Sequence, residues 1–187
     1  TYRYDALGRR VTKHALNSDP ADEIQIRYVY SGFQVLSEYA GSSGAAPTAL
    51  ARSFIYGSYI DDPIALIDYQ GGSNLTFFFH SNDQASVVAL SDSQGAIVER
   101  MAYDCYGNFQ MFTPNGTLNP NTVSIIGNPY RFTGRRWDKE TGLHYFRARY
   151  FDSLLGRFVN RDPFGFVDGM NLYSGYFAQY GAVDPYG

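Results

Sequence analysis

The chain is poor in the features that mark several protein classes. Its 187 residues include one cysteine, Cys105, which excludes an internal disulfide framework and a cysteine-based zinc site. Charged residues make up 18% and the net charge is −3, so composition gives no reason to expect binding of nucleic acid or an anionic membrane surface. The longest apolar stretches, such as that around residues 86–90, are far shorter than the ~20 residues of a membrane span.

Aromatic residues, in contrast, are nearly as numerous as charged ones, at 17% against 18%. A disordered chain has the opposite balance, so this one is expected to fold. Its 19 glycines exceed the usual share of ~7% and predict many tight turns. The three histidines, His14, His80 and His144, are far apart in the sequence. Their spacing supports no metal site, and we expect neither a metal nor a cofactor.

The pattern of residues predicts an all-β protein. Helical periodicity is hard to find, whereas short runs rich in aromatic and β-branched residues recur, each closed by Gly, Asn, Asp or Pro. Strands are predicted at residues 24–30, 52–56, 65–68, 76–80, 86–90, 97–103 and 143–151. Along the last of these, Arg147 and Arg149 are expected to share a strand face with Tyr145. Two low-complexity stretches, 40–51 and 113–128, are predicted to be surface loops.

Three turns carry the same chemistry. Residues 5–8, 92–95 and 104–107 all have Asp first and Gly fourth, which is typical of a type I turn. Residues 2–9 and 101–108 also share an aromatic–Asp–x–x–Gly–polar pattern after an alternating strand. A repeated strand–turn unit cannot bury its aromatic face alone. The repeat therefore predicts a solenoid-like sheet built by stacking.

Three blocks of sequence resemble a known family. The first is the Tyr-Asp repeat at residues 2–11, and the second runs from Phe79-His80-Ser81-Asn82-Asp83 to Tyr103-Asp104-Cys105-Tyr106-Gly107. The third extends from Arg131-Phe132-Thr133-Gly134 through Arg147-Ala148-Arg149-Tyr150 and Asp162-Pro163-Phe164-Gly165 to Asp184-Pro185-Tyr186-Gly187. Together they resemble the YD-repeat, or RHS-repeat, proteins of bacteria, and in particular their C-terminal RHS-associated core.

The resemblance implies a fragment of a spiral β-strand shell with an inward-winding C-terminal plug. Residues 1–128 would form the YD-repeat strands and residues 129–187 the closing segment, as one continuous unit of a longer chain. In polymorphic and Tc-type toxins such a shell encloses a C-terminal polypeptide. An intramolecular aspartyl protease severs this polypeptide just after the final Asp-Pro-x-Gly. The implied partners are the rest of the shell and this cargo, and the implied location is secreted or on the bacterial cell surface, with the signal outside these residues.

In this sequence, the resemblance implies that Asp162 and Asp184 are the catalytic pair, with Arg149 as their partner. Pro185, Tyr186 and Gly187 would lie next to the cut. Paired carboxylates suit peptide hydrolysis because one must be ionised to activate water while the other is protonated to donate to the carbonyl. An arginine beside them orients a carboxylate through two parallel hydrogen bonds.

Two alternatives stay open from the residues alone. Asp-Pro-x-Gly is also a plain type I turn, and the chain would then be a non-enzymatic extracellular or cell-surface module, structural or adhesive, that assembles with neighbouring copies. The arginines between residues 131 and 161, interleaved with aromatics, superficially resemble a single-stranded nucleic-acid platform. Inward arginines among aromatics more often bind carbonyls, carboxylates or ring faces, so we expect a structural use and no nucleic acid.

Overall fold

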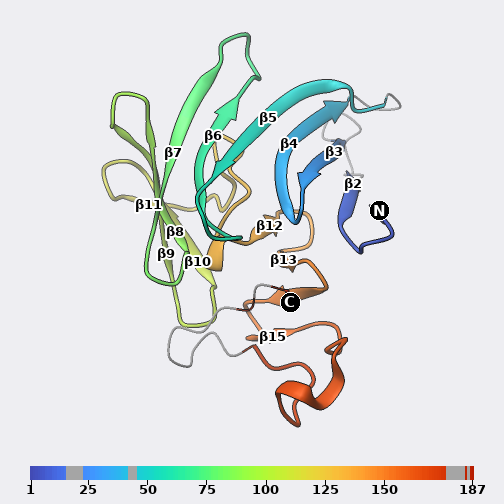
Figure 1. Cartoon of the computed structure of the whole chain (residues 1–187). Coiled ribbons are helices and arrows are strands. Elements are labelled where there is room, and N and C mark those ends of the chain that lie inside the picture. The colour runs from blue at the N-terminus through green and yellow to red at the C-terminus, as the bar shows by residue number, and fades with distance from the viewer. Residues whose placement is uncertain (16–22, 42–45, 176–183, 185) are drawn as a thin grey trace. The chain divides into compact units, whose positions relative to one another are not determined.

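The computed structural model describes residues 1–15, 23–41, 46–175, 184 and 186–187. They form two compact units, Thr1–Phe77 and Phe78–Gly187, whose strands are drawn in Figure 1. The described residues contain β-strands and two short 3-10 helices but no α-helix, which confirms the prediction of an all-β fold. Among these residues, no helix is both long and apolar enough to cross a membrane.

The first unit is an antiparallel meander in which each strand pairs with the next along the chain. Its strands are β1 (Tyr2–Tyr4), β2 (Arg10–Ala15), β3 (Ile24–Ser31), β4 (Gln34–Gly41), β5 (Ala49–Tyr56) and β6 (Pro63–Asp68). β7 (Leu75–Ser81) crosses the boundary between the units. Strands β4 and β5 extend into the predicted loop 40–51, of which residues 42–45 lie outside the described residues.

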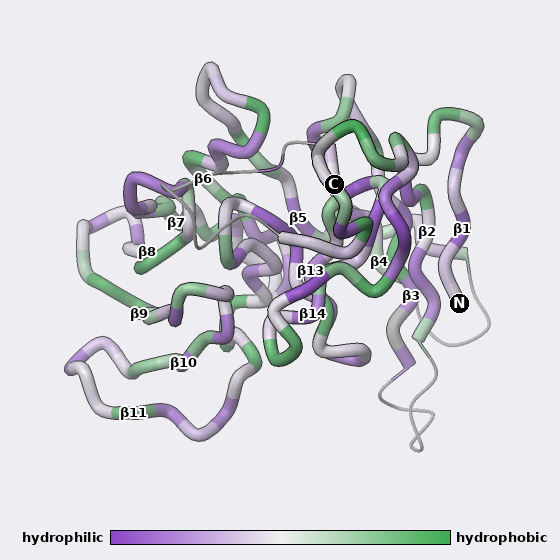
Figure 2. Tube along the Cα trace, turned by 90° about the horizontal axis from the view of Figure 1, so that it is seen from below, coloured by the Kyte–Doolittle hydropathy of each residue, from purple (hydrophilic) through white to green (hydrophobic). Residues whose placement is uncertain are grey.

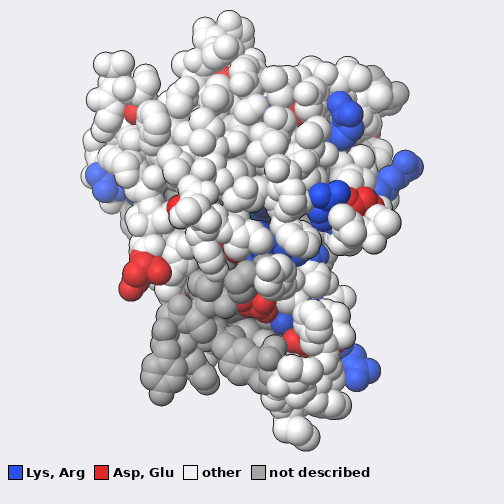
Figure 3. Space-filling model, viewed as in Figure 1, with Lys and Arg blue, Asp and Glu red and all other residues white. Residues whose placement is uncertain are grey.

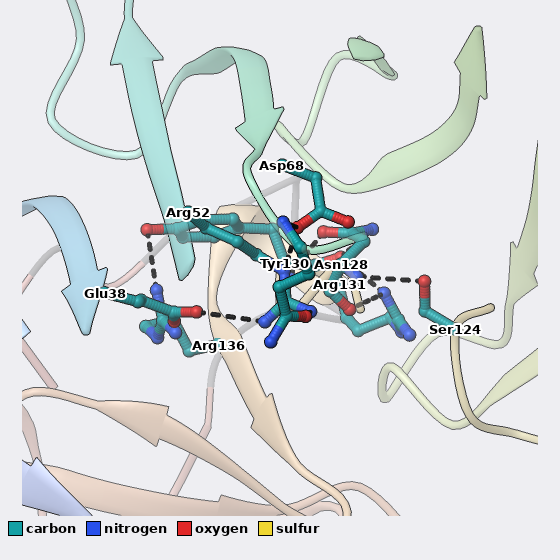
Figure 4. A network of polar contacts seen from close by, with 9 residues as sticks. Glu38, Arg52, Asp68, Ser124, Asn128, Tyr130, Arg131 and Arg136 are labelled. Carbon is teal, nitrogen blue, oxygen red and sulfur yellow. Dashed lines mark hydrogen bonds and ion pairs between the residues drawn. The ribbon is translucent and has the colours of Figure 1, made fainter. Parts of the chain in front are cut away.

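The sequence failed to predict β2 and β4 because both bury charged side chains. Arg10 is buried in β2, where its guanidinium lies over the rings of Tyr2 and Tyr28, 4.9 and 5.4 Å from their centroids. Glu38 is buried in β4 and pairs with Arg52 of β5 at 3.3 Å (Figure 4). Inward charges that are paired or stacked on rings hide the apolar alternation by which a strand is recognised.

The second unit contains two sets of antiparallel strands, each again paired in sequence order. One consists of β8 (Val87–Asp92), β9 (Ile97–Tyr103), β10 (Phe109–Phe112) and β11 (Leu118–Asn119). The other consists of β12 (Arg136–Asp138), β13 (Leu143–Phe146), β14 (Arg149–Asp152) and β15 (Arg157–Phe158). The 3-10 helices are η2 (Phe132–Gly134) and η3 (Gly165–Asp168).

Along the strands, hydrophobic and hydrophilic residues are interspersed rather than gathered in long segments (Figure 2). This distribution suits sheets whose opposite faces meet different surroundings. The predicted division of the chain after residue 128 falls within the second unit, between β11 and η2, and it stays a prediction.

The predicted Asp-to-Gly turns are confirmed. In each, the amide of the fourth-position Gly donates to the carbonyl of Asp5, Asp92 or Asp104 at 3.0–3.1 Å. One carboxylate oxygen of each Asp also accepts from the amides two and four residues later, at 2.8–3.0 Å. Asn82 makes the same contacts through its amide oxygen, with Ala85 (φ +58°) where the other turns have Gly. Asp and Asn are therefore interchangeable as caps of this turn.

The predicted strand 143–151 is wrong, because the segment is a hairpin. Phe146 of β13 pairs with Arg149 of β14, which leaves a two-residue turn between them. Arg147 occupies this turn with φ +64°, where Gly or Asn is usual. The amide of Ala148 donates to the Tyr186 carbonyl at 3.3 Å, so a contact distant in sequence supports the turn. Arg147 therefore does not share a strand face with Arg149.

The predicted surface loop 113–128 is partly buried. The Glu99 carboxylate of β9 accepts from the Ser124 hydroxyl at 2.6 Å and from the Ile125 amide at 2.7 Å. Asn128 is also buried, and its carbonyl accepts from the Arg131 guanidinium at 2.9 Å (Figure 4). Polar residues that look like a solvent-exposed loop thus serve to attach it to the sheet.

His144 of β13 is fully buried. Its ring meets those of Phe109 and Phe132 edge-on, with centroids 6.4 and 6.3 Å apart. Burial lowers the pKa of His144 to about 3; the Arg131 charge acts in the same direction, and Asp138 opposes it. His144 is therefore neutral at ordinary pH.

Candidate functional site

Aromatic rings from three neighbouring strands support the candidate site. Phe146 of β13, Phe151 of β14 and Phe158 of β15 belong to one buried cluster. Their ring centroids are 5.4–5.7 Å apart, within the range in which aromatic pairs attract. Strands β13, β14 and β15 therefore present a tightly packed apolar surface.

Arg149 lies on this surface. Its side chain is only 5% exposed, and its guanidinium carbon is 3.7 Å from the centroid of the Phe158 ring. A guanidinium stacks well on an aromatic face because it is planar and more weakly hydrated than an ammonium. The stacking leaves the edge of the guanidinium, with its N–H groups, for hydrogen bonds in its own plane.

Both predicted aspartates bind that one guanidinium. Oδ2 of Asp162 lies 2.9 Å from Nη1 of Arg149, and Oδ2 of Asp184 lies 2.9 Å from Nη2. The Asp162 side chain is 10% exposed and that of Asp184 is 34% exposed. The structure therefore brings together the three residues that the resemblance singled out, although they are distant in sequence.

Each aspartate also binds backbone amides that follow it through its other carboxylate oxygen. Oδ1 of Asp162 accepts from the Phe164 amide at 2.8 Å, and the Asp162 carbonyl accepts from the Gly165 amide at 3.1 Å. Oδ1 of Asp184 accepts from the amides of Tyr186 and Gly187 at 3.2 and 2.8 Å. The predicted turn at residues 162–165 is thus present. At 184–187, where residue 185 lies outside the described residues, the structure shows only the two contacts of Asp184 with the amides of Tyr186 and Gly187.

Of the three residues predicted beside the cut, Tyr186 and Gly187 are described and Pro185 lies outside the described residues. Tyr186 is exposed, whereas Gly187 is buried with φ +82°. A Cβ added at Gly187 would lie 1.8 Å from the Phe146 carbonyl oxygen. Glycine is therefore required there both by the backbone conformation and by the space available.

Sequence reasoning missed Arg135 as part of this site. Its guanidinium donates to the Asp184 carbonyl and lies over the Phe146 ring. Arg131 and Arg136 are also buried, and they donate to main-chain carbonyls and to the Tyr130 hydroxyl, respectively. These contacts confirm the predicted structural use of the arginine cluster. The sequence carries no signal that would have matched Arg135 to Asp184.

The part of the chain that the structure describes contains no assembled metal-binding group near the site. Among residues 1–15, 23–41, 46–175, 184 and 186–187, no three His, Cys, Asp or Glu side chains are grouped so that they could hold a metal ion. On the face shown in Figure 3, charged side chains lie singly or in small groups on a mostly uncharged surface. The described residues that meet at the site bring together two carboxylates and two guanidinium groups.

Comparison with known proteins identifies the family. The model of the teneurin YD-shell family matches residues 1–180. The chain belongs to this YD-shell family. This membership confirms the resemblance to YD-repeat proteins seen in the sequence. The fold agrees: a crystal structure of TcdB2-TccC3 matches 98% of the chain with a TM-score of 0.72 and 23% identity, and the chain covers 9% of that protein.

Similar sequences occur in a bacterial nuclease and in a bacterial toxin. The tRNA3(Ser)-specific nuclease WapA of Bacillus spizizenii is 32% identical over 185 residues, which is 99% of this chain and 7% of that protein. The double-stranded DNA deaminase toxin A of Burkholderia cenocepacia is 28% identical over 204 residues, covering 100% of this chain and 14% of that protein. The chain therefore spans only a small part of each relative.

Proposed function

We propose that this chain is the closing region of a YD shell that encloses a C-terminal polypeptide and releases it by self-cleavage just after residues 184–187. The proposal rests on one observation: the guanidinium of Arg149 binds the carboxylates of both Asp162 and Asp184. This contact lies beside the residues after which the cargo would begin. In this proposal the partners are the remainder of the shell and the cargo, and the whole protein is secreted or displayed on a bacterial surface.

The relatives support a shared role that is separate from their named activities. A tRNA nuclease and a DNA deaminase carry out unrelated chemistry, yet both contain a region similar to nearly all of this chain. This region is 7% of the length of the nuclease and 14% of the length of the deaminase. The named activities can therefore reside elsewhere in those proteins. A common function in packaging and release accounts for a common region.

The geometry suits hydrolysis by paired carboxylates. Hydrolysis by paired carboxylates needs one carboxyl group to activate water and another to donate a proton to the leaving group. Oδ2 of Asp162 and Oδ2 of Asp184 each lie 2.9 Å from one guanidinium, so two carboxyl groups for these roles meet at one place. Oδ1 of Asp184 is 2.8 Å from the Gly187 amide, which places this carboxylate within one residue of the bond proposed to break. Arg149 orients both carboxylates from one side.

Self-cleavage is tested in the full-length protein with its natural sequence beyond Gly187. Intact mass is followed over time for the wild type, Asp162→Asn and Asp184→Asn. Asn82 caps the same kind of turn elsewhere in the chain, so the Asn variants are expected to keep their turns. Asp152→Asn is the matched control, because Asp152 caps a turn through the amides of Leu154 and Leu155.

The wild type and Asp152→Asn are expected to be cut just after Gly187, and the other two variants to remain intact. A wild-type protein that stays whole would refute the protease proposal and favour the non-enzymatic structural module. If Asp162→Asn and Asp184→Asn are cut as fast as the wild type, cleavage is real but these aspartates do not catalyse it.

A further inference from the structure

Arg135 is held in a fixed position by the backbone before it. The Arg131 amide donates to the Arg135 carbonyl at 2.8 Å, and the intervening Thr133 and Gly134 have φ +49° and +66°. The Thr133 amide donates to the Ser86 hydroxyl at 2.9 Å, which attaches this turn to the start of β8. The side chain of Arg135 therefore leaves a backbone that is constrained at several points.

The Arg135 side chain is directed to the main chain of the C-terminal turn. It is 3% exposed, its guanidinium carbon is 4.7 Å from the Phe146 ring centroid, and Nη2 donates to the Asp184 carbonyl. Arg149 binds the side chain of the same aspartate at 2.9 Å. Two buried guanidinium groups thus hold Asp184, one by its carboxylate and one by its backbone.

The hairpin between β13 and β14 holds the same turn further along. The Ala148 amide donates to the Tyr186 carbonyl, and the Phe146 carbonyl lies against Gly187. Together with the Arg135 contact, these interactions use main-chain atoms of residues 184, 186 and 187. The described residues of this segment, 184, 186 and 187, are therefore held largely through main-chain atoms.

We propose that Arg135 is a positioning residue for the release reaction. By holding the Asp184 carbonyl, it keeps the backbone of residues 184–187 in the register that presents the following peptide bond to Asp162 and Asp184. This inference rests on the proposed self-cleavage. A displacement of about 1 Å of a reacting group can slow a reaction ~100-fold, so the expected loss without Arg135 is about 10- to 100-fold.

The test compares Arg135→Ala, Arg135→Lys and Arg136→Gln in the full-length protein, with the time course of intact mass as readout. Arg136 is the matched control because it is a buried arginine over an aromatic ring, 5.2 Å from the Tyr130 centroid, and donates to the Tyr130 hydroxyl. Arg135→Ala is expected to cut slowly, with some cuts at neighbouring bonds. Lysine should restore part of the rate, and so should millimolar guanidinium ion added to Arg135→Ala. Arg136→Gln should cut at the wild-type rate.

Two outcomes of the cleavage assay would overturn the inference. The first is an unchanged rate for Arg135→Ala. The second is a loss that neither lysine nor guanidinium ion restores and that Arg136→Gln shares, because such a loss reflects general stability.

If the wild type is not cut, the proposed function fails, and with it a role of Arg135 in release. Hydrogen exchange at the Tyr186 and Gly187 amides then tests the contact separately: faster exchange in Arg135→Ala shows that Arg135 positions this segment, and unchanged exchange refutes the positioning contact as well.

Discussion

Acid should destabilise the chain through His144. The pKa of a histidine in an unfolded chain is about 6.5, whereas burial lowers the pKa of His144 in the folded chain to about 3. As pH falls below the first value, the unfolded chain takes up a proton that the folded chain cannot accept. The stabilisation by neutral His144 is therefore complete above pH ~6.5 and is lost progressively down to pH ~3.

The magnitude follows from the two pKa values. Between pH 7 and pH 5 the loss is about 2 kcal/mol in the free energy of unfolding, since each further pH unit contributes about 1.4 kcal/mol. The Arg131 charge strengthens the effect and Asp138 weakens it. Other carboxyl groups also titrate at acidic pH, so the prediction concerns the difference between the wild type and a variant without this histidine.

Urea unfolding at pH 7, 6 and 5 measures this difference. Trp137, the single tryptophan of the chain, pairs with His144 across β12 and β13 and provides a local fluorescence signal. His144→Phe, placed among Phe109 and Phe132, should lose about 2 kcal/mol less than the wild type on going to pH 5. Gly116→Ala, which changes no titratable group, should retain the wild-type dependence. Equal losses in the wild type and His144→Phe would refute the reasoning.

Three further changes test the turns and the attached loop, each by urea unfolding at pH 7. Ala85→Gly should stabilise the chain by about 0.5–1 kcal/mol, because Ala85 has φ +58°. Conversely, Gly95→Ala should cost about 1 kcal/mol, because Gly95 has φ +82° although a Cβ there would meet no other atom. Gly107→Ala should cost about 2 kcal/mol more than Gly116→Ala, since the two share nearly the same φ but only at Gly107 would a Cβ lie 2.3 Å from the Phe132 ring. Glu99→Gln should cost about 1–2 kcal/mol by weakening the hydrogen bonds to the loop at residues 124–125.

The sequence predicts the turns of this fold better than it predicts some strands. An Asp-to-Gly turn is encoded within five residues, because the carboxylate binds amides two and four positions later. β2 and β4 depend instead on partners on other strands, since Arg10 and Glu38 are buried only because Tyr28 and Arg52 meet them. The hairpin at Arg147 likewise depends on Tyr186. Local chemistry can be read from one sequence, whereas these distant pairings cannot.

The candidate site was predictable only in part, for the same reason. The resemblance indicated Asp162, Asp184 and Arg149 through their motifs. The spacing of these three residues in the sequence does not show that they meet in the fold. The approach of the three residues depends on Phe158, on which Arg149 stacks. Arg135 contacts a backbone carbonyl, and every residue has one, so no residue type in the sequence indicates that partner.

The two interpretations of Asp-Pro-x-Gly, a plain turn and a catalytic element, are compatible at the level of atoms. In Asp162 and Asp184, Oδ1 accepts from backbone amides that follow the residue, while Oδ2 binds Arg149. Substitution can separate the two roles: Asn keeps an oxygen for the turn amides and removes the charge, whereas Ala removes both. If release depends on the charge, each Asn variant should fold and stay uncut. Each Ala variant should stay uncut and also lose about 1 kcal/mol of stability from its turn.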